Sequence, residues 1–184
     1  MTKAFRSSRS DGIKSIPDSP TSSGPEPVPP GRWLVFGGGV AVALAALAVY
    51  HNSFSGPFVL DDVPTIPENS TLRDLSRALS PPADAGVGDR PVLNLTFALN
   101  YALGGTAVWG YHAVNLLIHA LAGIVLFGLV RRTLQRPGLR ERYGADALPL
   151  GLAVAVLWTV HPLQTEAVTY ISERAESLMG LFYR

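Results

Sequence analysis

An uncharged apolar run from Trp33 to Tyr50 constrains this chain more than any other feature of its sequence. At ~1.5 Å per residue, a helix over this run crosses most of the hydrocarbon core of a bilayer. Trp33 and Tyr50 then lie at the two interfaces, where aromatic side chains are common. Only 16% of the residues are charged, which also places the chain among membrane proteins. The net charge of +1 gives no basic surface for nucleic acid, and the lack of cysteine excludes disulfides and thiolate chemistry.

The distribution of charge predicts how the chain lies across the membrane. Basic residues gather before the first apolar run and after a second one, whereas the segment between them leans acidic. Positively charged loops stay in the cytoplasm. We therefore expect a cytoplasmic N-terminus, a cytoplasmic loop at 131–146 and an external loop at 51–106, which is periplasmic if the membrane is a bacterial inner membrane. The basic residues are Lys3, Arg6, Arg9, Lys14, Arg32, Arg131, Arg132, Arg136, Arg140 and Arg142.

Further apolar runs predict an all-α, multi-span membrane protein built as a helical bundle. We place spans at about residues 33–50, 107–130 and 147–160, and the start of a fourth at Ser177. Residues 1–31 are rich in Ser and Pro and predict a disordered cytoplasmic tail, so that residues 32–184 form the membrane domain. Because an apolar helix cannot sensibly end half-way into a bilayer, we expect the chain to be the N-terminal fragment of a larger bundle.

Two short interfacial helices are expected in the external loop. The sequence "STLRDLSRALS" places Leu72, Leu75 and Leu79 on one face of a helix, with charged residues on the other. A second, mostly apolar helix begins at Pro91, which suits a first helical turn, and runs to Leu103. Both helices would lie at the membrane surface.

An adjacent acidic pair, Asp61 and Asp62, follows the first span closely. Carboxylates held at a membrane surface suit a general base, a metal ligand or an ion site, and they contribute nothing to the stability of the span. Like charges this close raise one pKa of the pair, which helps a base. We favour Asp62 slightly over Asp61. The alternative is that the pair only caps the Pro-rich turn that follows it.

A second polar cluster lies in "HPLQTEAVTYISERAE". On a helix that begins near Pro162, Glu166, Tyr170 and Glu173 share one face, and His161 stands at the membrane edge. Glu166 could orient an acceptor, or bind a divalent cation together with the acidic pair; no cofactor is certain. The alternative is a solvated helix face whose Glu–Arg pairs contribute a few tenths of a kcal/mol, about 0.2–0.5 each.

Two arginines near these carboxylates could hold a phosphate group. Arg174 lies beside the acidic face and could bind the phosphate of a lipid carrier with both arms of its guanidinium. Arg90, just before Pro91, is either a second phosphate contact or an interface residue whose charge reaches into water.

A polar stripe in the second span carries His112, Asn115 and His119. Polar groups inside a bilayer usually face protein and find partners there. Two histidines two turns apart are too few and too distant for a metal site. We therefore expect these side chains to form hydrogen bonds between helices.

Four blocks of this sequence, in this order and spacing, resemble a known family. They are "FVLDD", "RPVLNLTFALNYALGG", "GYHAVNLLIHALAGIVLF" and "VHPLQTEAVTYISERAESLMGLFYR". They are similar to the N-terminal portion of the transmembrane, tetratricopeptide-repeat-containing protein O-mannosyltransferases and their bacterial relatives, which belong to the GT-C class of glycosyltransferases. The resemblance covers about residues 54–184. The "SERAE" segment is a minor departure, because the family often has a small residue before the Arg.

The resemblance implies a transferase with many spans and an active site on the external face. Such enzymes move a sugar, usually mannose, from a polyprenyl-phosphate carrier to a hydroxyl of a protein. An acidic residue of the first external loop serves as the base, which here implies Asp61 or Asp62. The partners are therefore the lipid-linked donor, an exported acceptor protein and the bilayer itself. Tetratricopeptide repeats usually follow the membrane part of the family.

Two other functions fit parts of the sequence. A transporter also places charged residues near spans, but transporters favour sites at the membrane midplane, and here the carboxylates lie in loops or just beyond spans. A non-catalytic membrane anchor for a repeat domain would tolerate Asn at Asp61 and Asp62, whereas an enzyme would not.

Overall fold

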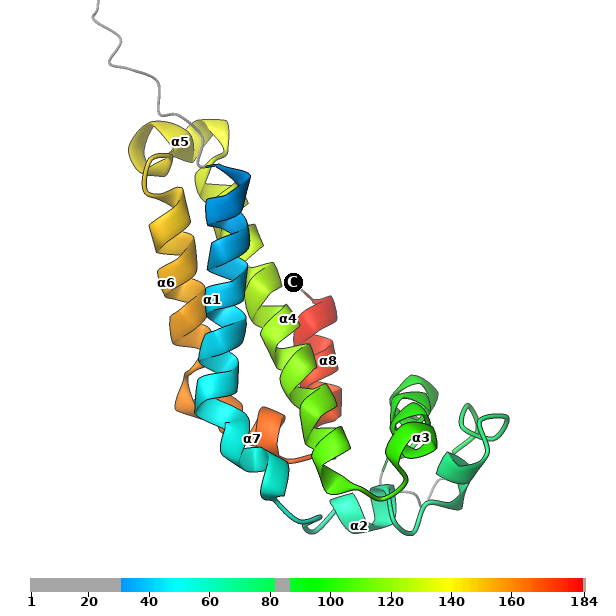
Figure 1. The fold of residues 1–184 in the computed structure, drawn as a ribbon. Helices are drawn as coiled ribbons and strands as arrows, with labels where there is room; N and C mark the ends of the chain where they lie inside the picture. The colour runs from blue at the N-terminus through cyan, green and yellow to red at the C-terminus, as the bar shows by residue number, and fades with distance from the viewer. Residues whose placement is uncertain (1–30, 82–86, 184) are drawn as a thin grey trace, which may run out of the picture.

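Three long helices form a bundle that runs the length of the molecule (Figure 1). The computed structural model describes residues 31–81 and 87–183. Its long helices are α1 (Arg32–Tyr50), α4 (Val108–Leu134) and α6 (Ala147–Thr159), and no strand occurs in the described ranges. The chain is therefore all-α, as its sequence predicts. The predicted tail, apart from Gly31, lies outside the described residues.

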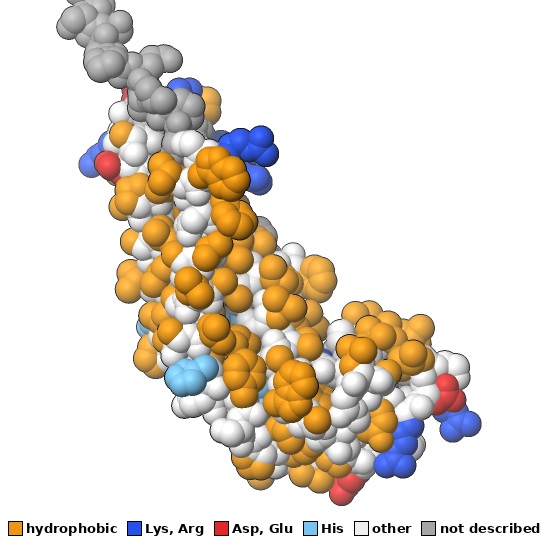
Figure 2. Space-filling view, in the orientation of Figure 1, with side chains coloured by type: hydrophobic (Ala, Val, Ile, Leu, Met, Phe, Trp, Pro, Cys, Tyr) orange, Lys and Arg blue, Asp and Glu red, His pale blue; other side chains and the backbone are white. Residues whose placement is uncertain are grey.

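Helices α1 and α4 are long and apolar enough to cross a membrane, while α6 reaches that length only with a bent continuation. At ~1.5 Å per residue, α4 is about 40 Å long and exceeds the hydrocarbon core of a bilayer. Large apolar side chains remain exposed along the bundle, for example Trp33 and Phe36 on α1. Figure 2 shows hydrophobic side chains covering the bundle between its two ends. This surface suits lipid, so we treat the chain as a membrane protein.

Helix α4 is the central element of the bundle, because it packs against α1, α6 and the C-terminal α8 (Arg174–Phe182). The three long helices meet closely at Gly123 of α4. A Cβ atom at this position would lie 2.5 Å from Oγ1 of Thr159 and 2.8 Å from Cγ1 of Val42. Only glycine therefore permits this crossing, as small residues generally do between membrane helices.

The chain bends sharply after α6. The short turns η3 (Pro162–Gln164) and α7 (Thr165–Thr169) continue it at an angle of 54° to α6. The continuous helix that the sequence predicts from Pro162 to Glu173 does not form, because the chain becomes extended at Tyr170, the residue after α7. Helix α8 then runs back beside α4, and the chain ends part-way along it (Figure 1). At the opposite end, α5 (Pro137–Tyr143) connects α4 to α6.

The loop between α1 and α4 folds into a small cap at the end of the bundle. It contains η1 (His51–Ser55), α2 (Asp62–Thr65), η2 (Ser70–Arg73) and α3 (Pro91–Gly104). The predicted helix from Pro91 is confirmed. The predicted amphipathic helix at residues 70–80 is wrong, since only the turn η2 forms. Leu72 is buried there, but Leu75 and Leu79 stay exposed.

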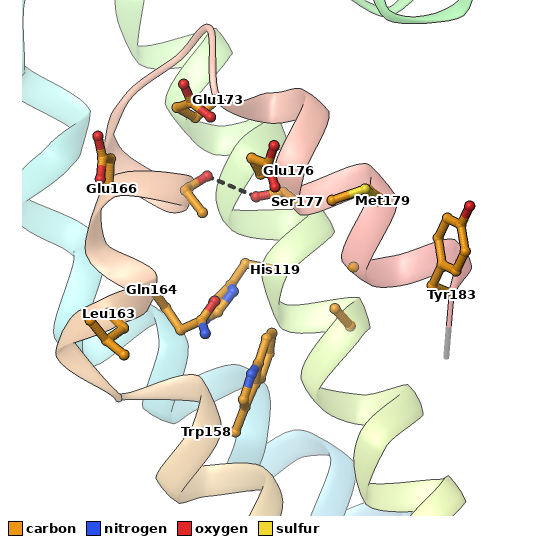
Figure 3. A pocket seen from close by; sticks show the side chains of 13 residues that line it. His119, Trp158, Leu163, Gln164, Glu166, Glu173, Glu176, Ser177, Met179 and Tyr183 are labelled. Atoms are coloured by element: carbon orange, nitrogen blue, oxygen red, sulfur yellow. Dashed lines mark hydrogen bonds between the residues drawn. The ribbon is translucent and has the colours of Figure 1, made fainter.

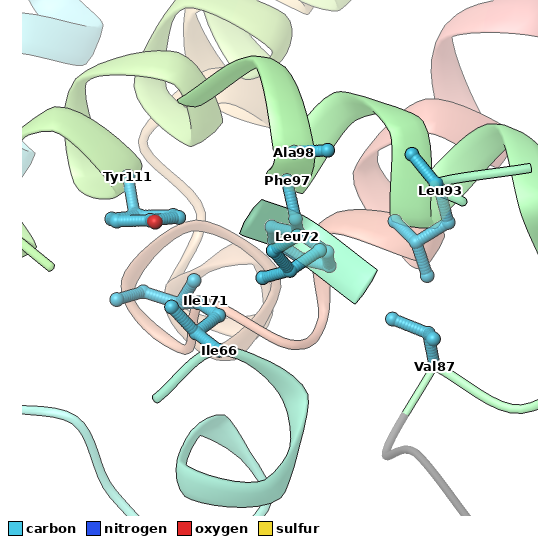
Figure 4. Packing of buried hydrophobic residues seen from close by; sticks show 9 residues of the cluster. Ile66, Leu72, Val87, Leu93, Phe97, Ala98, Tyr111 and Ile171 are labelled. Carbon is cyan, nitrogen blue, oxygen red and sulfur yellow. The ribbon is translucent and has the colours of Figure 1, made fainter. Parts of the chain in front are cut away.

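The cap has its own apolar core, which joins it to α4 and to the chain before α8 (Figure 4). Leu72, Phe97, Tyr111 and Ile171 come from four separate segments and are all almost fully buried. Burial of this kind contributes roughly 1.5–3 kcal/mol for each large apolar side chain. The core therefore fixes the loop between α1 and α4 against the segment that precedes α8, and this contact positions the candidate site.

Buried amides hold the rest of the cap together. Asn94 of α3 donates to Oγ1 of Thr71 and to the carbonyl of Ala78, and it accepts from Nδ2 of Asn69. Asn69 in turn accepts from the backbone N–H of Thr71, which begins η2. The side-chain amides of Asn69 and Asn94 thus have partners in the interior of the cap, as buried polar groups require.

Candidate functional site

The acidic pair lies at the entrance to α2, directly after a strained residue. Leu60 has a φ of 44°, in the left-handed region, and it is the only non-glycine residue with positive φ in the described ranges. Such a conformation costs about 1–3 kcal/mol for a side chain of this kind and often occurs at functional sites. The turn at Leu60 lets two adjacent carboxylates enter opposite environments.

Asp62 points into the protein and is completely buried. Its Oδ1 accepts a hydrogen bond from the backbone N–H of Ser172 at 2.8 Å, and its Oδ2 accepts from the N–H of Val59 at 3.2 Å. Two backbone donors are a typical arrangement for a buried carboxylate. Asp62 therefore connects the cap to the segment before α8.

Asp61 is exposed, in contrast to its neighbour. Its backbone N–H donates to the hydroxyl of Tyr170 at 3.1 Å, and its carboxylate makes no hydrogen bond within the described structure. The two aspartates thus bind adjacent parts of the same segment, Asp61 at Tyr170 and Asp62 at Ser172. This arrangement fixes the backbone of Asp61 at the end of the bundle, where its carboxylate faces solvent.

Further acidic side chains gather around Glu173. Burial raises the pKa of Glu173 above its ordinary value of 4.5, and the nearby carboxylates of Glu176, Glu166 and Asp61 raise it further. The guanidinium of Arg90 acts in the opposite direction. Carboxylates from the cap and from the chain around α7 and α8 therefore share one electrostatic environment, and the exposed Arg90 lies close enough to act on it.

Arg174 lies inside the protein, not at its surface. It is fully buried, and its Nε donates to Oδ1 of Asn115 at 2.7 Å. Its terminal nitrogens donate to Oγ1 of Thr96 at 3.3 Å and to the carbonyl of Tyr111 at 3.2 Å. The guanidinium also stacks 4.3 Å from the ring centre of Phe97. Arg174 thus joins α3, α4 and α8, and in this structure its donors are used by protein atoms.

Two of the three residues of the polar stripe of α4, Asn115 and His119, form hydrogen bonds between segments, as the sequence predicts. The prediction is wrong for His112, because neither nitrogen of its buried ring has a hydrogen-bond partner among the described residues. Asn115 accepts from Arg174 and directs its Nδ2 toward the carbonyls of Tyr170 and Ile171. Nε2 of His119 lies 2.9 Å from the carbonyl of Thr159, so it is the protonated nitrogen of that ring. The stripe therefore anchors the bend after α6.

His161 and Glu166 occupy the outer surface of that bend, and both are exposed. Nδ1 of His161 accepts from the backbone N–H of Leu163 and so caps η3. Glu166 lies in the first turn of α7. In the described ranges, no three imidazole or carboxylate groups come close enough to hold a metal ion. Glu166 and the acidic pair therefore do not form a preassembled cation site here.

A cavity of about 700 Å³ extends along the bundle from the carboxylates of the α7 and α8 region. Glu166, Glu173 and Glu176 line one end of it, and Trp158 lies at the other, with His119 between them (Figure 3). Met179 of α8 and Tyr183, the residue after α8, contribute further apolar surface. The cavity thus combines an acidic end near the cap with an apolar wall at the depth of the membrane helices.

Sequence reasoning found the two acidic clusters but not how they connect. Tyr170 was expected on a helix face with Glu166, and instead its hydroxyl accepts the N–H of Asp61. Ser172 was not singled out, because its contribution is a backbone donor that no side-chain pattern reveals. The opposite environments of Asp61 and Asp62 likewise depend on the turn at Leu60.

Comparison with known proteins identifies the family of this chain. It is 37% identical over 142 residues to the protein O-mannosyl-transferase Tmtc1 of Drosophila melanogaster, covering 71% of this chain and 15% of that protein. It is 33% identical over 145 residues to the protein O-mannosyl-transferase F38B6.6 of Caenorhabditis elegans, covering 72% of this chain and 20% of that protein. The chain belongs to the TMTC protein O-mannosyl-transferase family. Human TMTC4 is 32% identical over 167 residues, or 78% of this chain.

This TMTC family chain spans about a fifth or less of the length of the curated relatives that it matches. No protein-family model and no solved structure matches it. The resemblance of the four sequence blocks to this family is therefore confirmed by relatives alone.

Proposed function

We propose that this chain forms part of a membrane glycosyltransferase. The enzyme moves a hexose, for which we propose mannose, from a polyprenyl-phosphate carrier to Ser or Thr of an exported protein. The observation that carries the proposal is the exposed carboxylate of Asp61 at the end of the bundle, where the hydroxyl of Tyr170 and the buried neighbour Asp62 hold the backbone of Asp61. The printed names of the relatives, protein O-mannosyl-transferases, supply the reaction class.

Asp61 is the proposed general base. A Ser or Thr hydroxyl of the acceptor loses its proton to this carboxylate as its oxygen attacks the anomeric carbon of the sugar. The bond from that carbon to the phosphate oxygen breaks, and the polyprenyl phosphate leaves with the electron pair. Asp62 is completely buried, so an acceptor hydroxyl cannot reach its carboxylate, and we assign it the positioning of Asp61.

Arg90 is the proposed contact for the departing phosphate. The leaving group gains negative charge in the transition state, and a cation held nearby stabilises that charge. Arg90 is exposed and close enough to Glu173 to influence its pKa, whereas Arg174 is buried on protein acceptors. We therefore transfer the phosphate contact first expected of Arg174 to Arg90 and treat Arg174 as a positioning residue.

The cavity along α8 is the proposed place of the donor's lipid chain. Its apolar wall at Trp158, Met179 and Tyr183 suits a hydrocarbon chain, and its other end approaches the carboxylates. Exposed carboxylates such as Glu166 would orient the acceptor peptide. In this arrangement the cap faces the non-cytoplasmic side, in agreement with the arginines at the α5 end of the bundle.

Transfer from a defined donor tests this proposal. The complete product of the gene is purified and incubated with polyprenyl-phosphate mannose and a Ser/Thr-containing peptide from an exported protein of the same cell. Mass spectrometry should detect a gain of one hexose on the peptide, and none when a nucleotide-linked mannose replaces the lipid donor. If the folded protein transfers no hexose from polyprenyl-phosphate mannose, glucose or galactose, the proposal fails, and a membrane-anchoring function takes its place.

A further inference from the structure

A second cavity lies at the other end of the bundle, far from the acidic pair. It is a groove of about 890 Å³ between the first half of α1 and the second half of α4. Gly39 and Ala43, one turn apart on α1, leave room at its floor, as does Gly128 of α4. A Cβ atom added at Gly128 would meet no atom within 4 Å. The groove is therefore open along the direction of the membrane helices.

Arginines surround the outer end of this groove. Arg32 begins α1, and Arg131 and Arg132 lie in the last turn of α4. None of them forms an ion pair with an acidic side chain of the described residues. Arg131 directs Nη1 to Oε1 of Gln135 at 3.3 Å, but its Nε is buried without a hydrogen-bond partner in that same part of the chain. A buried donor of this kind is costly unless a ligand satisfies it.

We propose that this groove binds an anionic glycerophospholipid of the leaflet at the arginine end. The phosphate and its negative headgroup lie among the arginines, whose planar guanidinium groups bind phosphate oxygens well. One acyl chain lies in the groove over Gly128. Figure 2 shows Arg side chains at this end of the bundle, with acidic side chains beside some of them, above a surface of hydrophobic side chains. The arginines at the groove are the charges that the headgroup of such a lipid complements.

The apolar groove and the arginines should contribute separately to lipid binding. A dependence on both distinguishes a specific site from a general attraction of arginines to a charged membrane. If the arginines only extended their charges into water, lipid binding would not depend on the groove beneath them. An apolar groove alone would hold zwitterionic and anionic lipids equally well. A site that uses both prefers the anionic headgroup and also loses its lipid when the groove is filled.

Native mass spectrometry of the delipidated protein, as the complete gene product, tests the site. Phosphatidylglycerol and phosphatidylcholine with identical chains are the probes. We expect wild type to retain phosphatidylglycerol more strongly, with a loss of about fivefold in affinity for each arginine removed in the double variant Arg32→Gln/Arg132→Gln. Gly128→Leu should weaken retention of both lipids.

Two control variants match these changes outside the groove. Arg140→Gln removes an exposed charge on α5, and Gly37→Leu adds a side chain on α1 where a Cβ would meet nothing within 4 Å. Both should bind lipid as wild type does. Equal retention of the two lipids by wild type, or an equal loss in Arg140→Gln and Arg32→Gln/Arg132→Gln, would overturn the proposal. Since wild type alone gives the first comparison, the test does not depend on any variant folding.

Discussion

The backbone N–H of Ser172 donates to Oδ1 of Asp62 over 2.8 Å, across a separation of 110 residues in the chain. This bond joins the loop between α1 and α4 to the segment between α7 and α8. Asp62 is fully buried, and so it acts as an internal support for its exposed neighbour Asp61. The adjacent carboxylates therefore have different roles, one structural and one proposed to be chemical.

Replacing Asp62 by Asn should destabilise the protein. An Asn side chain can offer only one acceptor oxygen, so its amide group would face the N–H of either Val59 or Ser172. We expect a loss of about 1–3 kcal/mol in the free energy of unfolding, measured by denaturant titration in detergent micelles. Asp61→Asn is the matched control and should change stability by less than about 0.5 kcal/mol. Equal stabilities of the two variants would contradict the role of Asp62.

Replacing Arg174 by an uncharged side chain of similar length should destabilise the protein. Arg174→Met leaves Oδ1 of Asn115 without its donor in the interior, which should cost about 1–3 kcal/mol. Arg174→Lys retains one donor and the charge and should lie between Met and wild type. Thermal unfolding followed by circular dichroism measures the order of the three proteins. An Arg174→Met variant as stable as the exposed control Arg90→Met would refute this role.

Substitutions at two glycines of α4, Gly123 and Gly128, should change the stability of the protein in opposite directions. Gly123→Ala places a methyl group against Thr159 and Val42 and should cost about 1–3 kcal/mol. Gly128→Ala, five residues further along α4, meets nothing and should gain about 0.5–1 kcal/mol from helix propensity. Unfolding of both variants under identical detergent conditions measures the difference. A Gly123→Ala variant as stable as Gly128→Ala would show that α1, α4 and α6 do not pack this closely.

Glu173 should make stability depend on pH. Burial is the main cause of its raised pKa, and Glu176, Glu166 and Asp61 add to it. A carboxyl whose pKa is higher in the folded state opposes folding once it ionises. This cost is absent well below the ordinary value of 4.5 and grows as the pH rises through the folded pKa.

We therefore expect Glu173→Gln to be more stable than wild type at neutral pH and to match it in acid. Melting temperatures measured across a pH series give the comparison. Glu141→Gln, at an exposed position of α5, should follow wild type throughout. A constant difference between Glu173→Gln and wild type at every pH would contradict the raised pKa of Glu173.

Periodicity and hydropathy predict much of this fold, because long apolar helices depend on local sequence. The runs at Trp33–Tyr50 and 107–130 form α1 and α4 almost as expected. The segment at residues 70–80 fails for a physical reason. The side chain of Asn69 accepts from the N–H of Thr71 and begins η2, whereas the side chain of Asp74 accepts from the N–H of Ser76, so the turn ends after Arg73 against the helical pattern of the leucines.

The candidate site was only half predictable, since its geometry comes from tertiary contacts. Charge and position identify Asp61 and Asp62, but their opposite orientations follow from the turn at Leu60 and the donors of a distant segment. Arg174 resembles a surface cation by its neighbours Glu173 and Glu176. In the structure Arg174 is buried and donates to Asn115, which lies 59 residues earlier in the chain, and no local sequence pattern predicts such a contact.

The most direct test of the proposed chemistry is the rate of hexose transfer by Asp61→Asn, measured in the complete gene product with polyprenyl-phosphate mannose as donor. Loss of a general base predicts a rate at least about 100-fold below that of wild type. The unfolding free energy should not change, and the exposed control Glu68→Gln should retain full activity. An Asp61→Asn protein that transfers hexose at the wild-type rate would contradict the assignment of Asp61 as the base.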